Sequence, residues 1–221
     1  MAKTERSHSL KTQNSKAIWL LVAADVVIVT LVLTGFAFTQ ASLMELAHSA
    51  FVRGILLAAT GPLIAVFLHD LLSSDAKASI VFWRIKDVLP GHRAFSKHAE
   101  ADPRIDLAAL KAKVGEFPQS PRDQNSTWYR LYQKHQSNVS VSDAHKRFLL
   151  FRDAASLTVL ITIVTSVAGV LAGIPLSLQA MLFGGLVVQF MWLALSARNT
   201  GIRFVQNVLA VEVTDDGRKK K

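Results

Sequence analysis

One carboxylate, Asp25, lies inside an apolar stretch of the sequence and is the first candidate for chemistry. It is the only charged residue in the run from Ala17 to Phe38. A charge inside hydrocarbon is costly, so such residues usually face the interior of a helix bundle or a water path. Two interpretations stay open. Asp25 takes part in ion or proton movement, or it lies about two helical turns inside the cytoplasmic edge and is only hydrated or paired.

A second group of polar side chains follows one face of a later apolar helix. Thr158, Thr162 and Thr165 recur every three or four residues, and Gly169 continues the spacing. Residues at this spacing share one face of a helix. Hydroxyls can contact ions, so the face could line or gate a pore. Small residues at the same spacing also let two helices pack closely, and Gln189 in the next apolar run could continue either surface.

Basic residues between positions 73 and 152 form the third candidate site. This segment contains fourteen Lys and Arg against eight Asp and Glu, interleaved with Trp83, Trp128, Tyr129 and Tyr132. Cations among aromatic rings suit a phosphate backbone with stacked bases. Anionic lipid headgroups would account for the basic residues close to a membrane, and core packing is the usual role of aromatic residues at helical spacing. The predicted ligand-binding residues are Arg84, Lys86, Arg93, Lys97, Arg130, Lys134, Lys146 and Arg147.

Enzymatic signatures are missing from the sequence. It contains no G-x-x-x-x-G-K-[ST], G-x-G-x-x-G, G-x-S-x-G or H-E-x-x-H motif. It has no Cys, which excludes disulfides, thiolate zinc sites and cysteine nucleophiles. The scattered histidines are more simply interpreted as solvated or hydrogen-bonding side chains than as metal ligands. We therefore predict no enzymatic activity, no metal site and no cofactor.

Apolar helices must position these residues. The chain is 51% hydrophobic, and 44 consecutive residues from Ala154 to Ala197 carry no charge or His. A transmembrane helix needs about 20 apolar residues. Because Gly173-Ile174-Pro175 predicts a turn near the middle, this run predicts two spans. The run from Ala17 to Phe38 predicts another, and the less apolar stretch from Phe51 to Leu72 a fourth.

The distribution of basic residues predicts the orientation. Of the 25 Lys and Arg, 24 lie in the two tails and in the segment 73–152, which should therefore face the cytoplasm. The sequence predicts an all-α membrane protein with four transmembrane helices and both termini inside the cell. The predicted parts are a tail at 1–16, a hairpin at 17–72, a basic cytoplasmic helical domain at 73–152, a hairpin at 153–197 and a basic tail at 198–221.

Four helices are expected inside the cytoplasmic domain, and no strand-like alternation is present. The first should run from Lys77 to Val88 with Ile85 on its apolar face. The second should be capped by Asp102, and the third should begin at Ser120-Pro121. The fourth should be capped by Ser142 and continue directly into the third span.

The stretch from Leu89 to Asp153 resembles small four-span membrane proteins of bacterial anti-phage defence operons, closest to the membrane component of the Hailong type. The similar segments are LPGHRAF, ADPRIDLAALKAKVGEFP, QNSTWYRLYQKHQ and AHKRFLLFRD. The resemblance implies a homo-oligomeric, tetrameric ion channel in the bacterial inner membrane. Its partner would be a nucleotidyltransferase encoded in the same operon, whose short single-stranded DNA product holds the channel shut until infection removes it.

Together with this resemblance, the polar, small-residue and basic patterns lead to the hypothesis of a pore-forming defence effector gated by an anionic oligonucleotide on its cytoplasmic side. The alternative is a non-conducting membrane scaffold or adaptor whose helical loop recruits a cytoplasmic protein. A transporter using Asp25 is a third hypothesis. Two observations count against a transporter: the sequence predicts only four spans, and it shows no inverted repeat.

Overall fold

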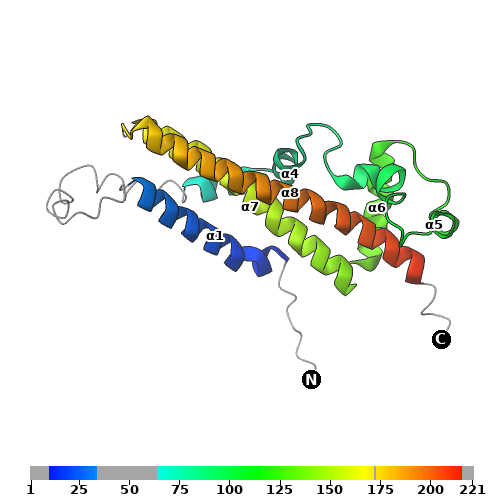
Figure 1. The fold of residues 1–221 in the computed structure, drawn as a ribbon. Helices are drawn as coiled ribbons and strands as arrows, with labels where there is room; N and C mark the ends of the chain where they lie inside the picture. The colour runs from blue at the N-terminus through cyan, green and yellow to red at the C-terminus, as the bar shows by residue number, and fades with distance from the viewer. Residues whose placement is uncertain (1–9, 34–63, 172, 216–221) are drawn as a thin grey trace, which may run out of the picture. The chain divides into compact units, whose positions relative to one another are not determined.

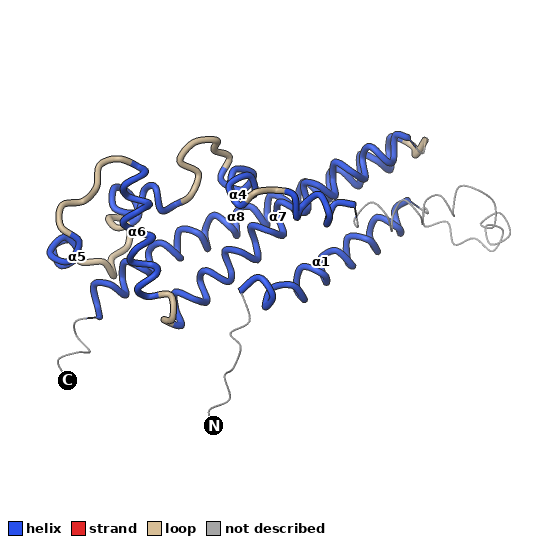
Figure 2. Tube along the Cα trace, turned by 180° about the vertical axis from the view of Figure 1, so that it is seen from behind, coloured by secondary structure: helices blue, strands red, loops and turns tan. Residues whose placement is uncertain are grey.

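The computed structural model describes residues 10–33, 64–171 and 173–215, and their regular structure is helical throughout (Figures 1 and 2). The predicted all-α fold is thereby confirmed. The main elements are α1 (Leu10–Leu33), α4 (Ser74–Phe82), η1 (Pro90–Arg93), η2 (Ala94–His98), α5 (Leu107–Val114), α6 (Pro121–His135), α7 (Val139–Leu171) and α8 (Leu176–Thr214).

Contacts divide the chain into two compact units. The first, here called the apolar unit, comprises residues 1–73 and 153–193. The second, called the basic unit, comprises residues 74–152 and 194–221. Both α7 and α8 are continuous across the boundary, so each contributes one part to each unit.

Among the described residues, α7 and α8 are the two helices long and apolar enough to cross a membrane. The turn predicted between them is present, because α7 ends at Leu171 and α8 begins at Leu176. Gly173 has a φ of 68°, and the Ile174 N–H donates to the Gly169 carbonyl at 3.0 Å. A positive φ suits glycine, which explains this residue at the helix end.

The other two predicted spans are described only in part. Helix α1 covers the first predicted span as far as Leu33, and a helix at 64–71 represents the end of the second. The remainder of both, the connection 39–50 and the last residues of the C-terminal tail lie outside the described residues. Four spans with both termini inside the cell therefore stay a prediction.

The apolar unit has a core of small and branched side chains and an apolar exterior. Its main cluster joins α1, the 64–71 helix, α7 and α8 through Val22, Ala65, Leu157, Ile161 and Leu186. Large apolar residues also face outward, namely Leu20, Ile28, Phe67, Ile163, Val167, Val170, Leu171, Phe183, Val188 and Trp192. An apolar exterior of this extent is typical of a surface that contacts lipid or another protein.

The basic unit begins with a helix shorter than predicted. Helix α4 ends at Phe82, whereas the sequence predicted a helix running to Val88. Trp83 and Asp87 have φ values of 52° and 50°, which no α-helix tolerates. Ile85, predicted on the apolar face, is 99% exposed. The prediction was wrong because hydrophobic spacing continues past a point where the backbone has already left the helical region.

Helix α5 is capped by a different aspartate from the one predicted. The Asp106 carboxylate accepts hydrogen bonds from the backbone N–H groups of Ala108 and Ala109 at 2.9 and 3.1 Å. Asp102 instead accepts hydrogen bonds from the Arg104 guanidinium, at 2.6 Å for the shortest. Such charge-assisted bonds are stronger than an ordinary capping bond, and they hold the pKa of Asp102 below its ordinary value.

Helices α6 and α7 begin close to their predicted positions. The Ser120 hydroxyl accepts a hydrogen bond from the Asp123 N–H at 3.1 Å, as its predicted capping role requires. Helix α7 starts at Val139, and the Asn138 side chain accepts from the Ser140 N–H at 3.0 Å. Ser142 therefore lies inside the helix and does not cap it. The predicted continuation of this helix into the third apolar run is confirmed.

The end of α8 supplies much of the core of the basic unit. Phe204, Val205, Val208 and Leu209 are buried there against side chains of η2, α5, α6 and α7. From sequence, residues 198–221 are predicted only as a basic tail. Their spacing of one and four residues would have indicated a buried helical face.

Candidate functional site

Three predicted pore residues from three helices meet in the apolar unit, in what we call the polar cluster: Asp25 of α1, Thr158 of α7 and Gln189 of α8. The Gln189 side-chain nitrogen donates to the two Asp25 carboxylate oxygens at 3.0 and 3.3 Å. The same nitrogen lies 3.4 Å from the Thr158 hydroxyl oxygen. Asp25 is only 1% exposed. The structure thus joins Asp25 to two polar residues that lie more than a hundred positions later in the sequence.

The hydrogen-bond directions in the polar cluster are consistent with one another. The Thr158 hydroxyl donates to the Ala154 carbonyl at 3.0 Å, so its oxygen can accept from Gln189. The Gln189 side-chain nitrogen can then donate to two acceptor groups, the Asp25 carboxylate and the Thr158 hydroxyl. A carboxylate can accept about four hydrogen bonds. Asp25 therefore has acceptor capacity beyond what one amide nitrogen supplies, which a water molecule or a cation can use.

Thr162 and Thr165, also predicted at the pore, use their hydroxyls differently. Each donates to a carbonyl of its own helix, Thr162 to Thr158 at 2.7 Å and Thr165 to Ile161 at 2.6 Å. This satisfies a hydroxyl in apolar surroundings without a partner helix. Nearer the turn, a Cβ added to Gly169 would lie 3.2 Å from the Gln179 side chain, so this end of the threonine face serves helix packing.

Sequence reasoning missed a second buried polar contact in the same unit. His69 and Ser156 are both buried, and the His69 Nε2 lies 3.1 Å from the Ser156 hydroxyl. Ser156 also donates to the Asp153 carbonyl at 3.0 Å. A histidine at the end of an apolar run is the signal that could have indicated this contact.

The eight predicted ligand-binding cations fall into separate environments of the basic unit. The Arg93 guanidinium donates to the Asp87 carbonyl at 3.0 Å, and burial followed by the nearby charge of Arg84 lowers the pKa of Arg93. Arg130 donates to the Thr127 hydroxyl at 3.1 Å. Arg84, Lys86, Lys97 and Arg147 are exposed, while Lys146 is half-buried.

Lys134 forms an ion pair with the buried carboxylate of Glu212. Its ammonium group lies 2.8 and 2.9 Å from the two carboxylate oxygens of Glu212. Glu212 also receives a hydrogen bond from the buried His135 imidazole. Because the Glu212 carboxylate neutralises the Lys134 ammonium group, Lys134 has a structural role in addition to any contact with a ligand.

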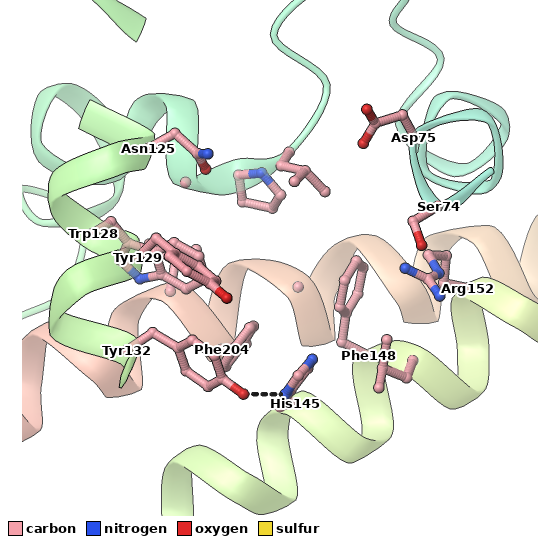
Figure 3. Close-up of a pocket in the computed structure, with 16 residues that line it drawn as sticks. Ser74, Asp75, Asn125, Trp128, Tyr129, Tyr132, His145, Phe148, Arg152 and Phe204 are labelled. Carbon is pink, nitrogen blue, oxygen red and sulfur yellow. Dashed lines mark hydrogen bonds between the residues drawn. The ribbon is translucent and has the colours of Figure 1, made fainter. Parts of the chain in front are cut away.

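The basic unit contains a cavity of about 280 Å³ that is lined mainly by rings, here called the aromatic cavity (Figure 3). The rings come from α6, α7 and the end of α8: Trp128, Tyr129, Tyr132, His145, Phe148 and Phe204. Asp75, Ser74 and Arg152 lie together at one end of the view, and Asn125 lies at the other (Figure 3).

Close ring packing fixes the walls of the aromatic cavity. Trp128 and Tyr132 stack with centroids 5.9 Å apart, and Phe204 meets both edge-on at 5.2 Å. His145 lies parallel to Phe204 at 4.5 Å, and its Nδ1 is 3.1 Å from the Tyr132 hydroxyl. Aromatic pairs of this kind are rigid and add to the stability of a site. The cavity is therefore preformed.

Two polar atoms at the aromatic cavity are left unsatisfied. Within the part of the chain that the structure describes, neither the Trp128 indole N–H nor the Asn125 amide oxygen has a hydrogen-bond partner. Trp128 is 6% exposed, so its unpaired donor is costly. Gly91 permits this crowding, because a Cβ there would lie 2.3 Å from the Asn125 oxygen. A planar ligand with its own donors and acceptors suits such a cavity.

His98 makes the stability of the basic unit depend on pH. It is buried, and burial together with the charges of Arg93 and Lys97 lowers the pKa of His98 from 6.5 to about 4. Between these values the unfolded chain binds the proton and the folded chain does not. His98 therefore does not reduce the stability of the basic unit above pH 6.5, but it reduces that stability progressively as the pH falls from 6.5 toward 4.

We expect urea unfolding of the full-length protein in detergent to show about 1–2 kcal/mol less stability at about pH 5 than at about pH 7. His98→Gln should reduce this difference without abolishing it, because glutamine does not titrate, whereas His145, whose pKa is also lowered to about 4 by burial and the charge of Arg152, still contributes. An unchanged difference in this variant would show that other groups are responsible.

The chain has no match among known protein families, curated proteins or solved structures. The two arrangements that can carry a function are the polar cluster, which suits ions, and the aromatic cavity, which suits a planar ligand.

Proposed function

We propose that this protein is a pore-forming membrane effector whose ion conduction is controlled by an anionic nucleotide ligand on its cytoplasmic side. The observation that carries the proposal is the polar cluster, in which Gln189 holds the Asp25 carboxylate 1% exposed among apolar helices. Ionisable groups in such positions usually mark ion pathways. The oxygen atoms of a carboxylate, an amide and a hydroxyl can also replace the water around a cation.

The electrostatics of the polar cluster favour a cation. A monovalent cation at about 4 Å from a carboxylate gains about 4 kcal/mol at an effective dielectric constant of about 20. One copy has too few spans to enclose a pore, so several copies must surround it. The resemblance to four-span defence proteins supports a tetramer, and the apolar exterior of the apolar unit offers surfaces on which copies can pack.

The aromatic cavity supplies the ligand site in this proposal. A base would stack among its rings and use the unpaired Trp128 donor and Asn125 acceptor, while its phosphates would meet basic side chains. Arg130 directly follows Tyr129 on α6, and Lys146 directly follows His145 on α7, so cations accompany two lining residues. Helix α7 carries both His145 and Thr158, and α8 carries both Gln189 and Phe204. Ligand binding can therefore stabilise a closed arrangement of the same helices.

The biological part of the proposal comes from the resemblance. The protein would lie in the bacterial inner membrane with four spans and both termini in the cytoplasm. A nucleotidyltransferase would supply a short single-stranded DNA that keeps the pore closed. Loss of that ligand during phage infection would open the pore, depolarise the cell and limit phage replication.

Flux through liposomes that contain the purified full-length protein tests the proposal. We expect potassium efflux without ligand and at least about threefold slower efflux with a short single-stranded DNA, with binding that weakens steeply as salt rises. Tyr129→Ala combined with Arg130→Ala should keep the efflux but lose the response to DNA. Impermeable liposomes under both conditions would contradict conduction and favour the scaffold or adaptor alternative.

A further inference from the structure

Four residues that follow α4 form an exposed and unusual turn, here called the tip: Trp83, Arg84, Ile85 and Lys86. Ile85 is 99% exposed and Trp83 is 54% exposed, although both are large and apolar. Trp83 also has a φ of 52°, a conformation that bulky side chains rarely adopt. A strained backbone that presents apolar side chains outward needs a reason in its surroundings.

Arg198 of α8 fixes the tip. Its guanidinium Nε donates to the Val81 carbonyl at 2.6 Å, next to the end of α4. The guanidinium carbon lies 3.5 Å from the centre of the Trp83 ring, as in a cation–π contact. The tip is therefore held against α8 at a defined residue.

The position of Arg198 places the tip relative to a membrane. Arg198 is the first charged residue after the uncharged run from Ala154 to Ala197. If α8 crosses a bilayer, this residue lies at the boundary between hydrocarbon and headgroups. Trp83 stacks on it and so lies at the same depth. This step depends on α8 crossing a membrane, but it requires neither conduction nor the nucleotide ligand.

We propose that the tip is a lipid-binding element that inserts Ile85 and Trp83 at the membrane surface and binds the phosphate of an anionic phospholipid through Arg84 and Lys86. Tryptophan favours the interface, where its ring is covered and its N–H remains wet. Transfer of the apolar isoleucine side chain from water into lipid is favourable. Cations beside these residues are attracted to anionic headgroups of the cytoplasmic leaflet.

Basic side chains are close to one another around the tip. Arg84 lies within electrostatic range of both Arg93 and Arg198, and the one acidic neighbour among these interactions is Asp87, beside Arg93. Positive charge is in excess among these groups. A headgroup phosphate at the tip would neutralise the excess.

A lipid fits the tip better than a nucleic acid does. Arg198 already covers one face of Trp83, which limits stacking with a base. Ile85 has neither a ring nor a polar group, so it can neither stack on a base nor form a hydrogen bond with it. Its side chain can pack among apolar lipid chains. The aromatic rings suited to a base line the aromatic cavity instead.

The lack of cysteine makes the test specific. Full-length Ile85→Cys can carry a single environment-sensitive fluorophore, and the fully exposed position tolerates the change. Gln133→Cys, at an exposed position on α6, is the matched control. Both proteins are placed in vesicles of phosphatidylcholine, with and without phosphatidylglycerol, in which either lipid can carry a bromine quencher on its chains.

We expect the label at position 85 to be quenched by brominated lipid, more strongly by brominated phosphatidylglycerol, while the label at 133 is not quenched. Arg84→Gln with Lys86→Gln should reduce the preference for phosphatidylglycerol about fivefold or more, because each basic residue contributes to headgroup binding. Added inorganic phosphate should not displace the lipid.

Two outcomes would overturn the proposal. Equal, weak quenching at 85 and 133 would show that the tip faces water. Protection of the label at 85 by a short single-stranded DNA, without any quenching by lipid, would assign the tip to the nucleic acid. Both outcomes are separate from the flux experiment, so a failure of the tip would leave the pore proposal standing.

Discussion

Asp25→Asn should reduce cation efflux through the reconstituted protein by at least about tenfold, which corresponds to about 1.4 kcal/mol in the barrier. Asparagine keeps the size of the side chain and one oxygen that can accept from Gln189, so the packing of α1 against α8 should survive. What disappears is the negative charge that stabilises a cation in apolar surroundings. Efflux of potassium from liposomes, normalised to inserted protein, measures the effect.

A double variant that moves the negative charge to the neighbouring helix distinguishes an effect on conduction from an effect on folding. The double variant Asp25→Asn with Gln189→Glu moves the carboxylate across the same hydrogen bond, and it should restore a large part of the efflux. Asp70→Asn is the matched control, since the Asp70 side chain is 80% exposed and its loss should leave the efflux unchanged. Normal efflux through Asp25→Asn would mean that the polar cluster serves only to hold the helices together.

Glu212→Ala should destabilise the basic unit by about 3–5 kcal/mol. The Glu212 side chain is 6% exposed, and it accepts hydrogen bonds from Lys134 and from the equally buried His135. Removing the carboxylate leaves a buried imidazole without its acceptor and opens space between α6 and the end of α8. Hydrogen exchange of the α6 amides in the full-length protein reports this local loss directly.

Lys134→Ala provides the comparison. Its side chain is 52% exposed, so water replaces most of what the lost ion pair supplied, and the cost should stay below about 1 kcal/mol. Glu212→Gln, which retains one acceptor oxygen, should fall between the two. If Lys134→Ala and Glu212→Ala cost the same, the buried contact with His135 is not the source of the stability.

The residues of the polar cluster could be predicted from sequence because each is conspicuous. A carboxylate, a threonine and an amide interrupt otherwise apolar runs, and apolar periodicity predicts the helices that carry them. Their mutual hydrogen bonds could not be predicted, since they depend on how α1, α7 and α8 pack. The same limit applies to His69 and Ser156, which belong to different helices.

The tip and the aromatic cavity show where pattern analysis fails. Ile80, Val81, Ile85 and Val88 have helical spacing, yet the left-handed backbone at Trp83 ends the helix in their midst. No rule of spacing marks a non-glycine residue with positive φ. The aromatic residues of α6 were recognised, but their partners His145 and Phe204 lie on other helices, and only the folded chain brings these rings together.

The end of α8 has a practical consequence for anyone who wants to produce the hydrophilic half of the molecule separately. Among the described residues, four of the twelve that form its main buried cluster come from the end of α8, after both long apolar segments: Phe204, Val205, Val208 and Leu209. An expression fragment that stops at Arg152 would lack these four residues and would expose the apolar side chains that they cover. A soluble derivative would have to fuse residues 74–152 to 194–215 through a designed connector, bypassing everything encoded between.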